Sequence, residues 1–242
     1  MQLIHFEEIP EFKGSLRSNI VQVPEAINVC SGIRILGKCI KSLLFSTDVA
    51  IIRNTNADAI IAVYPFAPQP IITHALIMAA DKPVFCGVGG GPVSGKRTLE
   101  IALDAEFQGA LGVVLNQPAP NELIEALKER LEIPVIVTVV AENEDFQGRI
   151  DAGVDIFNVS GAAGTEAIVR RIRGIHPRIP IIATGGKDEF SILNTIKAGA
   201  NAITHTPPAA GDLLRTIMNT YREALTGNDE APPPAGQPGA SA

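Results

Sequence analysis

The chain lacks features that mark several classes of protein. Of its 242 residues only three are cysteine and four are histidine, and the cysteines follow no CxxC or Cys/His spacing. Disulfide frameworks and structural zinc sites depend on such spacings, so the sequence predicts neither of them. The cysteine content is instead typical of a reducing compartment.

Strong positive charge and long apolar runs are also missing. The formal net charge is -6 at pH 7 and the pI is about 5.3, whereas a nucleic-acid-binding protein needs a basic face. Apolar runs such as 59–63 are far shorter than the roughly 20 residues that a bilayer needs. The first 13 residues carry acids instead of a basic and then apolar signal. We therefore expect a cytoplasmic protein that binds neither nucleic acid nor a membrane.

The chain does contain a repeat of eight units. In each unit a run of β-branched and aliphatic residues ends at a small or polar residue, and an amphipathic stretch of about a dozen residues follows. The runs are 42–46, 59–64, 83–87, 111–116, 134–138, 155–160, 180–184 and 202–205. Eight βα units predict an α/β fold, the closed (β/α)8 TIM barrel, in which ligands lie at the carboxyl ends of the strands.

The repeat accounts for most of the chain as one domain. We expect residues 1–225 to form a single TIM-barrel domain, of which 1–40 are an amino-terminal extension. Residues 32–38 and 39–46 predict a hairpin joined at Gly37 and Lys38 that plugs the amino end of the barrel. Residues 226–242 are rich in Pro, Gly and small polar residues. Because they bury too little apolar area to offset chain entropy, they predict a disordered tail.

A glycine-rich loop follows the third run. The segment from Gly90 to Lys96 matches the GxxxxGK part of a P-loop, but Arg97 stands where a P-loop needs Ser or Thr to hold magnesium. The sequence therefore does not predict a nucleotide triphosphatase. Glycines allow close backbone approach and Lys96 adds positive charge, so the loop either binds an anion or forms a flexible lid or a plain turn.

The seventh and eighth runs carry the strongest functional signal. Gly185 and Gly186 directly follow the seventh run, and the segment 198–203 (AGANAI) leads into the eighth. These residues resemble the phosphate-binding barrel group that includes IMP dehydrogenase, nitronate monooxygenase, thiazole synthase and the tryptophan and histidine biosynthesis barrels. The resemblance implies that Gly185 and Gly186 bind a phosphate, either of a substrate or of FMN. One departure is segment 205–212 (HTPPAAGD), whose prolines offer no N–H to an anion.

Polar residues at other run ends are candidates for substrate contact. Asn116, Asn158 and Ser160 are neutral hydrogen-bonding groups, suited to orienting a substrate or stabilising developing negative charge. Since Asn158 and Ser160 are two residues apart, they share one strand face. His205 is the leading candidate for general acid/base catalysis, because its ordinary pKa is near neutrality and it ends the eighth run.

Two acids are further candidates for moving protons. Asp48 follows the first run and is either a catalytic acid or the N-cap of the next helix. Glu142 is the glutamate nearest the fifth run and is a candidate base, although acids at a helix start are often simply solvated. Tyr64 either contacts a ligand or packs at the rim. Cys86 is either a nucleophile or a buried thiol.

The residues missing from the strand ends narrow the chemistry. No lysine lies in the middle or at the carboxyl end of a run, so a Schiff-base aldolase is not predicted. Only His205 among the histidines ends a run, so no metal site is predicted. The leading hypothesis is an isomerase, lyase or synthase that acts on a small phosphorylated or anionic metabolite by acid/base chemistry without a metal or cofactor. The alternatives are an FMN-dependent oxidoreductase and a non-catalytic metabolite-binding or regulatory barrel, and homo-oligomer formation is open.

Overall fold

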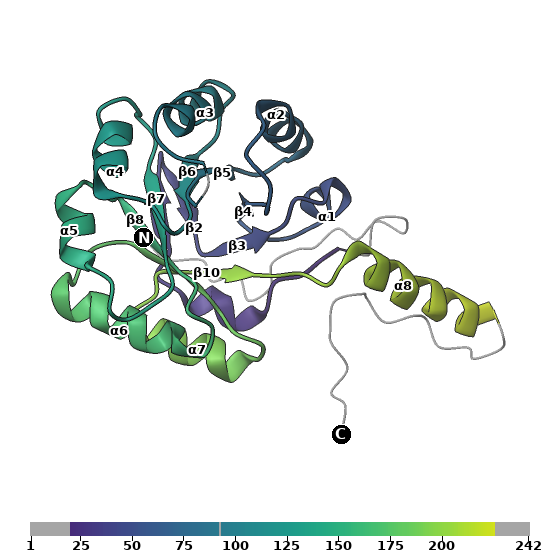
Figure 1. The fold of residues 1–242 in the computed structure, drawn as a ribbon. Coiled ribbons are helices and arrows are strands. Elements are labelled where there is room, and N and C mark those ends of the chain that lie inside the picture. Colours follow the sequence, from purple (N-terminus) through teal and green to yellow (C-terminus); the bar gives the residue numbers. More distant parts are fainter. Residues whose placement is uncertain (1–19, 92, 226–242) are drawn as a thin grey trace, which may run out of the picture.

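The computed structural model describes residues 20–91 and 93–225, which form a closed barrel of parallel strands surrounded by helices (Figure 1). Around the barrel the strands follow the order β10-β3-β4-β5-β6-β7-β8-β9. The predicted TIM barrel is therefore confirmed. The predicted tail, 226–242, and the first 19 residues of the predicted extension lie outside the described residues.

Each strand of the barrel overlaps one predicted run, and a helix follows each strand. The strands are β3 (Ser42–Phe45), β4 (Ala59–Ala62), β5 (Val84–Gly89), β6 (Gly112–Leu115), β7 (Val135–Val139), β8 (Ile156–Val159), β9 (Ile181–Thr184) and β10 (Ala202–His205). The helices are α1 (Val49–Arg53), α2 (Pro70–Ala79), α3 (Lys96–Phe107), α4 (Asn121–Lys128), α5 (Phe146–Asp151), α6 (Thr165–Ile175), α7 (Glu189–Ala198) and α8 (Ala210–Leu225). A short 3-10 turn, η2 (Ala162–Gly164), precedes α6.

Two buried clusters show which way each strand residue points. One cluster fills the barrel lumen and includes Leu43, Phe85 and Ala202. Their sequence neighbours Leu44 and Ile203 belong to the other cluster, which lies between the barrel and its helices. Because successive side chains along a regular strand point to opposite faces, residues two positions before or after a lumen residue also face the lumen.

The hairpin lies at the amino end of the barrel, as the sequence predicts. It consists of β1 (Ile33–Ile35) and β2 (Lys38–Ile40), which pair antiparallel. Ile33, Ile35 and Ile40 are buried in the lumen cluster. Gly37 supplies the turn with a φ of 83°, in the left-handed region that glycine adopts at little cost. The lumen is thus closed at this end, and ligands have access only from the carboxyl ends of the strands.

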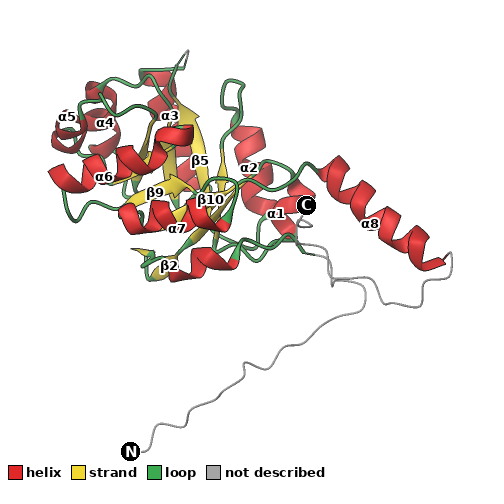
Figure 2. Cartoon of the chain, turned by 90° about the horizontal axis from the view of Figure 1, so that it is seen from below, coloured by secondary structure: helices red, strands yellow, loops and turns green. Residues whose placement is uncertain are grey.

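The last helix departs from the usual arrangement. Figures 1 and 2 show α8 extending away from the barrel instead of folding back onto it. A short 3-10 helix, η1 (Glu25–Val29), packs against α7, and Ile27 is fully buried in the outer cluster. On the α1 side, the Val21 N–H donates to the carbonyl of Asn54 at 2.8 Å. The amino-terminal segment therefore covers the barrel between α7 and α1, where an eighth helix would otherwise pack.

Candidate functional site

The carboxyl ends of strands β6 to β10 place small polar side chains on the lumen face. Val114, Ile136 and Ile182 belong to the lumen cluster, so the residue two positions later on each chain segment also faces the lumen. By the same alternation, Asn158 and Ser160 follow Ile156 on the lumen side of β8, and Thr204 follows Ala202 on the lumen side of β10. We call this set the polar arc: Asn116, Thr138, Asn158, Ser160, Thr184 and Thr204.

Hydrogen bonds link most of the polar arc. The Asn158 Nδ2 donates to Thr138 Oγ1 at 3.1 Å, and Thr138 Oγ1 donates to Asn116 Oδ1 at 3.3 Å. Thr184 Oγ1 and Ser160 Oγ lie 3.4 Å apart. These bonds fix the orientation of the side chains and leave the remaining amide and hydroxyl groups free to contact a ligand.

Thr204 differs from the rest of the polar arc. The residue is 7% exposed, and its Oγ1 is buried without a hydrogen-bond partner. Leaving a buried hydroxyl unpaired costs about 1–3 kcal/mol, so such a group calls for an explanation. Thr204 pairs in register with Thr184 and with Leu43, both on the lumen face. The Thr204 side chain is therefore on the lumen face of β10.

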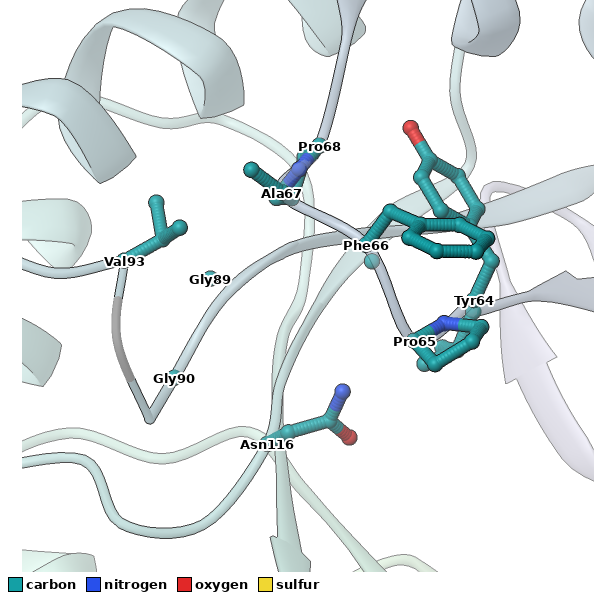
Figure 3. A pocket seen from close by; sticks show the side chains of 11 residues that line it. Tyr64, Pro65, Phe66, Ala67, Pro68, Gly89, Gly90, Val93 and Asn116 are labelled. Atoms are coloured by element: carbon teal, nitrogen blue, oxygen red, sulfur yellow. The ribbon is translucent and has the colours of Figure 1, made fainter.

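The opposite side of the barrel mouth is hollow, because β5 carries glycine where other strands carry side chains. Phe85 lies in the lumen, so alternation places Gly87 on the lumen face. The register shifts after Gly87, and a Cβ on Gly89 would meet Thr98 of α3 instead. A cavity of about 160 Å³ opens there, beside the loop that follows β4 (Figure 3). It is lined by Val63, Tyr64, Pro65, Phe66, Ala67, Pro68, Gly87, Gly89, Gly90, Val93 and Asn116.

Asn116 connects the cavity to the polar arc. It lines the cavity and also accepts the hydrogen bond from Thr138. In Figure 3 its amide points toward the loop that carries Pro65 and Phe66. The Tyr64 hydroxyl accepts the Gln69 N–H at 2.8 Å, so this side chain braces the loop. The site thus combines a polar wall on β6–β10 with a largely apolar wall on β4 and β5.

The backbone donors of the glycine-rich loop are used within the protein. Gly90 N–H donates to the Val93 carbonyl at 2.8 Å, and Gly91 N–H donates to the Pro118 carbonyl at 2.9 Å. A Cβ at Gly90, whose φ is 105°, would overlap the backbone of Asn116. Gly90 is therefore needed for close packing against the end of β6. Lys96 is the first residue of α3, and its side chain is exposed.

The Gly-Gly turn after β9 offers little to a phosphate. Gly185 N–H donates to the Thr204 carbonyl at 3.3 Å, and a Cβ on Gly185 would meet Ile203 Cγ2 at 2.6 Å. Gly186 has a φ of 86° and is exposed. The Asp188 carboxylate accepts the Ser191 N–H in a capping box at the start of α7, and these bonds lower its pKa. An anionic carboxylate thus occupies the helix end at which a phosphate would bind.

Asp48 and Glu142 lie outside the polar arc. The Asp48 carboxylate accepts the N–H groups of Ala50 at 2.8 Å and Ile51 at 3.1 Å, so it is the N-cap of α1. Glu142 is exposed in the loop after β7. That loop is held instead by Glu144, whose Oε1 accepts the Val140 N–H at 2.8 Å and whose other oxygen accepts from the Gln117 amide. Asp48 is therefore accounted for as a helix cap, whereas Glu142 lies at the surface.

His205 faces the outer layer. It is the residue after lumen-facing Thr204, and its register partner on β3 is Leu44, which lies in the outer cluster. By alternation the imidazole points away from the lumen. Burial lowers the pKa of His205, so the ring is neutral at pH 7. The structure does not bring His205, Asp48 and Glu142 together around one substrate position. Cys86 likewise lies in the outer cluster, and burial raises the pKa of its thiol to about 12.

The described residues hold no group of three or more His, Cys, Asp or Glu side chains arranged to bind a metal ion. Within the same residues, none of the helices combines the length and apolarity needed to span a bilayer.

Sequence reasoning missed Thr138, Thr184 and Thr204 as site residues. The signal that identifies them is the period of two, because each lies two positions after an apolar residue of the lumen. Thr138 pairs in register with Asn158, and Thr184 pairs with Thr204. Asn116, Asn158 and Ser160, which the sequence did single out, lie in the polar arc with them.

Comparisons of sequence show one distant relative. No family model matches the chain. The isopentenyl-diphosphate delta-isomerase of Vibrio parahaemolyticus serotype O3:K6 (strain RIMD 2210633) is 28% identical over 113 residues, covering 33% of each protein. The match thus spans about a third of the length of that curated relative.

Comparisons of structure show the fold. The phosphoenolpyruvate phosphomutase from Streptomyces platensis subsp. rosaceus has a TM-score of 0.60 at 13% identity, with 83% of this chain and 85% of that chain covered. A 2,3-dimethylmalate lyase, described as a member of the PEP mutase/isocitrate lyase superfamily, has a TM-score of 0.57 at 13% identity, covering 90% and 88%. A mandelate oxidase has a TM-score of 0.59 at 14% identity, covering 74% and 68%.

These neighbours differ from the group that the sequence resembles. The expected relation to IMP dehydrogenase, nitronate monooxygenase and thiazole synthase is not supported; the solved structures of similar fold include the phosphomutase and the dimethylmalate lyase. The corner formed by β9 and β10 also differs from the phosphate site that the resemblance implies. The Gly-Gly turn is present, but its first N–H is bonded within the protein, and α8 does not fold back to complete a phosphate site beside it.

Proposed function

We propose that the protein is a barrel enzyme of lyase or mutase type that acts on a small anionic metabolite, a carboxylate or a phosphate ester. The observation that carries the proposal is the unpartnered, lumen-facing hydroxyl of Thr204 within the polar arc. A carboxylate or phosphate oxygen would accept a hydrogen bond from this hydroxyl and remove the cost of burying it unpaired. The structural resemblance to a phosphomutase and a dimethylmalate lyase supports the same class of ligand.

The arrangement of the site supports a defined placement of the substrate. Its charged oxygens would bind to Thr204, Thr184 and Ser160, while an apolar portion would occupy the cavity beside Gly87. The Asn158 and Asn116 amides lie between these two regions, because hydrogen bonds join both of them to Thr138. Fixed neutral dipoles in this position stabilise negative charge that develops on a carbonyl oxygen when an adjacent bond breaks, which lyases and mutases of carboxylates require.

The experiment has a binding step and a turnover step. Thermal shift is measured with inorganic phosphate, phosphomonoesters and small oxo- and hydroxycarboxylates. Compounds that raise the melting temperature are then incubated with the protein and followed by proton and phosphorus NMR. We expect at least one carboxylate or phosphate ester to bind and to be converted. If no member of either class binds, the proposal fails.

A pocket-filling variant and a matched control locate the binding site. In Gly87→Ala the new Cβ would lie 3.2 Å from Val63 Cγ2, so the Val63 side chain has to shift slightly while the methyl group takes space at the cavity wall. Gly174→Ala lies on α6 with nothing near its Cβ. Ligand binding is expected to weaken in Gly87→Ala and to be unchanged in Gly174→Ala. Equal affinities in the two variants would place the ligand elsewhere.

A second candidate function is binding of the same metabolite class without chemistry, as in a regulatory barrel. The observation that favours it is the orientation of the titratable residues: His205 faces the outer layer, Asp48 caps α1 and Glu142 is exposed. The NMR experiment distinguishes the candidates, because binding without conversion of any compound favours the regulatory barrel.

The FMN-dependent alternative has less support. The corner at Gly185 and Gly186 does not fit a flavin phosphate well, since Gly185 N–H is bonded to Thr204 and the Asp188 carboxylate caps α7. Titration of the purified protein with FMN, followed by flavin fluorescence and the absorbance band of bound flavin, tests this alternative. Saturable binding would restore it.

A further inference from the structure

The cavity beside β5 has the size of a single ring. Its volume is about 160 Å³, and an apolar protein cavity of about 150 Å³ is large enough to bind benzene. Most of the residues that line it are Pro, Gly, Val, Ala or aromatic, and they come from β5 and from the loop that follows β4. A substrate made only of charged and hydroxyl groups would leave this lining without an apolar partner. The cavity therefore fits one apolar group about as large as benzene.

Phe66 presents an uncovered aromatic ring at the edge of this cavity. The residue lines the cavity and is nevertheless 73% exposed. Figure 3 shows Phe66 and Pro65 on one side of the cavity and Gly89 and Gly90 on the other. Aromatic rings favour stacked or edge-to-face contacts with other aromatic rings beyond the gain from burial alone. An aromatic ring in the cavity would thus cover the Phe66 ring and gain from this contact.

The loop that carries Phe66 is restrained in the ligand-free protein. Pro65, Pro68 and Pro70 each fix a backbone φ angle along it. The Gln69 N–H donates to the Tyr64 hydroxyl at 2.8 Å. Because the loop is already restrained, a ring that enters the cavity does not have to order it at a cost in binding free energy.

Gly87 keeps the other side of the cavity open. It lies on the lumen face of β5, and a Cβ there would lie 3.2 Å from Val63 Cγ2. Without a side chain at this position, the peptide groups of β5 offer a flat surface to a ring. Asn116 lines the cavity beside them, and its Oδ1 accepts the bond from Thr138. Its Nδ2 donates to no group among the described residues, so it is available to an oxygen attached near the ring.

We infer that this cavity binds one aromatic ring of the substrate, held between the Phe66 ring and the glycine surface of β5. Because the proposed function supplies the carboxylate or phosphate group at the polar arc, the ring site rests on that function and adds the substituent that the group carries. Phe66 and Gly87 then determine specificity. A sugar phosphate is disfavoured, since its hydroxyl groups would be buried against an apolar lining without hydrogen-bond partners.

Compounds that share an acid group and differ in the ring test this site. The full chain, labelled with ¹⁵N, is titrated with phenylacetate, cyclohexylacetate and acetate, and with phenyl phosphate and methyl phosphate. Shifts of the amide NMR signals give the dissociation constants. We expect each phenyl compound to bind at least about 10-fold more tightly than acetate or methyl phosphate, and phenylacetate to bind more tightly than cyclohexylacetate. If the acids bind but the ring makes no difference, the proposed function stands and the ring site is overturned.

Benzyl alcohol, which has the ring but no acid group, separates the ring site from the proposed function. It is expected to bind more weakly than phenylacetate, because it lacks the charged oxygens that the polar arc would bind. Equal affinities for benzyl alcohol and phenylacetate, both above that of acetate, would support the ring site and contradict the anion of the proposed function. If none of the compounds binds, both are overturned.

Two cavity variants and a matched control locate the ring. Phe66→Ala removes the aromatic contact, so the affinity for phenylacetate should fall about 2- to 10-fold and by more than that for cyclohexylacetate. Gly87→Ala should weaken both ring compounds, and neither variant should change the affinity for acetate. Phe107→Ala replaces an 81% exposed phenylalanine at the end of α3, outside the cavity lining, and should bind every compound as the wild type does. Far-UV circular dichroism establishes that each variant is folded. Unchanged phenylacetate binding in both cavity variants, or an equal loss in Phe107→Ala, overturns the ring site.

Discussion

Replacing Thr204 with valine isolates the unpartnered hydroxyl. The substitution keeps the branched shape of the side chain on β10 and exchanges the hydroxyl for a methyl group. Since the Oγ1 is buried and unpaired in the ligand-free protein, its removal is stabilising. An unpaired buried polar group costs about 1–3 kcal/mol, so we expect Thr204→Val to gain about 1–2 kcal/mol. In a domain of this size, that gain raises the melting temperature by about 2–8 °C.

The same substitution is expected to weaken the ligand. A hydrogen bond to a charged group contributes about 1.5–3 kcal/mol, so its loss reduces affinity about 10- to 150-fold. Calorimetric unfolding of the free protein and isothermal titration with the compound that stabilises the wild type measure both effects. Higher stability combined with lower affinity is the expected signature of a residue whose hydroxyl serves binding.

Thr195→Val is the matched control. Thr195 is also buried, at 4% exposed, but its Oγ1 donates to the Ser191 carbonyl at 2.9 Å within α7. Its replacement loses a hydrogen bond, so the melting temperature should fall or stay unchanged while affinity is retained. If Thr204→Val is destabilised to the same extent as Thr195→Val, or binds ligand as tightly as wild type, the assignment of the Thr204 hydroxyl to the site is wrong.

Three further predictions concern other parts of the structure. Gly90→Ala combines a positive φ with overlap on Asn116, so its free energy of unfolding in urea should fall by at least about 2 kcal/mol. Gly174→Ala has open space around its Cβ and should not reduce the free energy of unfolding. A tolerated Gly90→Ala would contradict the packing described. A disulfide reagent at pH 8 should modify Cys39 quickly and the two buried cysteines, whose pKa values burial raises to about 11 and 12, only after unfolding; a second fast thiol would refute this. Burial lowers the folded-state pKa of His205, so the unfolded protein takes up a proton more readily and the folded protein loses stability as the pH falls below about 6.5. The urea midpoints at pH 7 and pH 5 should therefore differ less in His205→Gln than in the wild type. An undiminished difference would refute the assignment.

The strands and their order could be predicted from the sequence, because runs of β-branched residues at regular spacing leave one closed arrangement. All eight predicted runs overlap observed strands. The hairpin was predicted too, since Gly37 marks its turn. Half of the polar arc was found by the same reasoning, because Asn116, Asn158 and Ser160 interrupt apolar runs at their carboxyl ends.

The remaining site residues were not found because polarity and position along the chain do not show on which side of a strand a residue lies. His205 was selected at the end of β10, but its neighbour Thr204 is the lumen-facing residue. A shift of one residue reverses the side on which a side chain points. The glycines were misleading for another reason: whether their N–H groups are available to an anion depends on distant carbonyls such as those of Pro118 and Thr204.

The sequence alone determined the barrel, its plugged amino end and the carboxyl ends of the strands as the region for ligands. These follow from local patterns, because the period of side chains and the turn residues act over a few positions. Only the tertiary structure decided that Thr204 is unpartnered and that α8 leaves the barrel, since both depend on contacts between segments far apart in the chain. The amino-terminal segment takes the place beside α1 through Val21, and α8 extends away from the barrel instead of packing there.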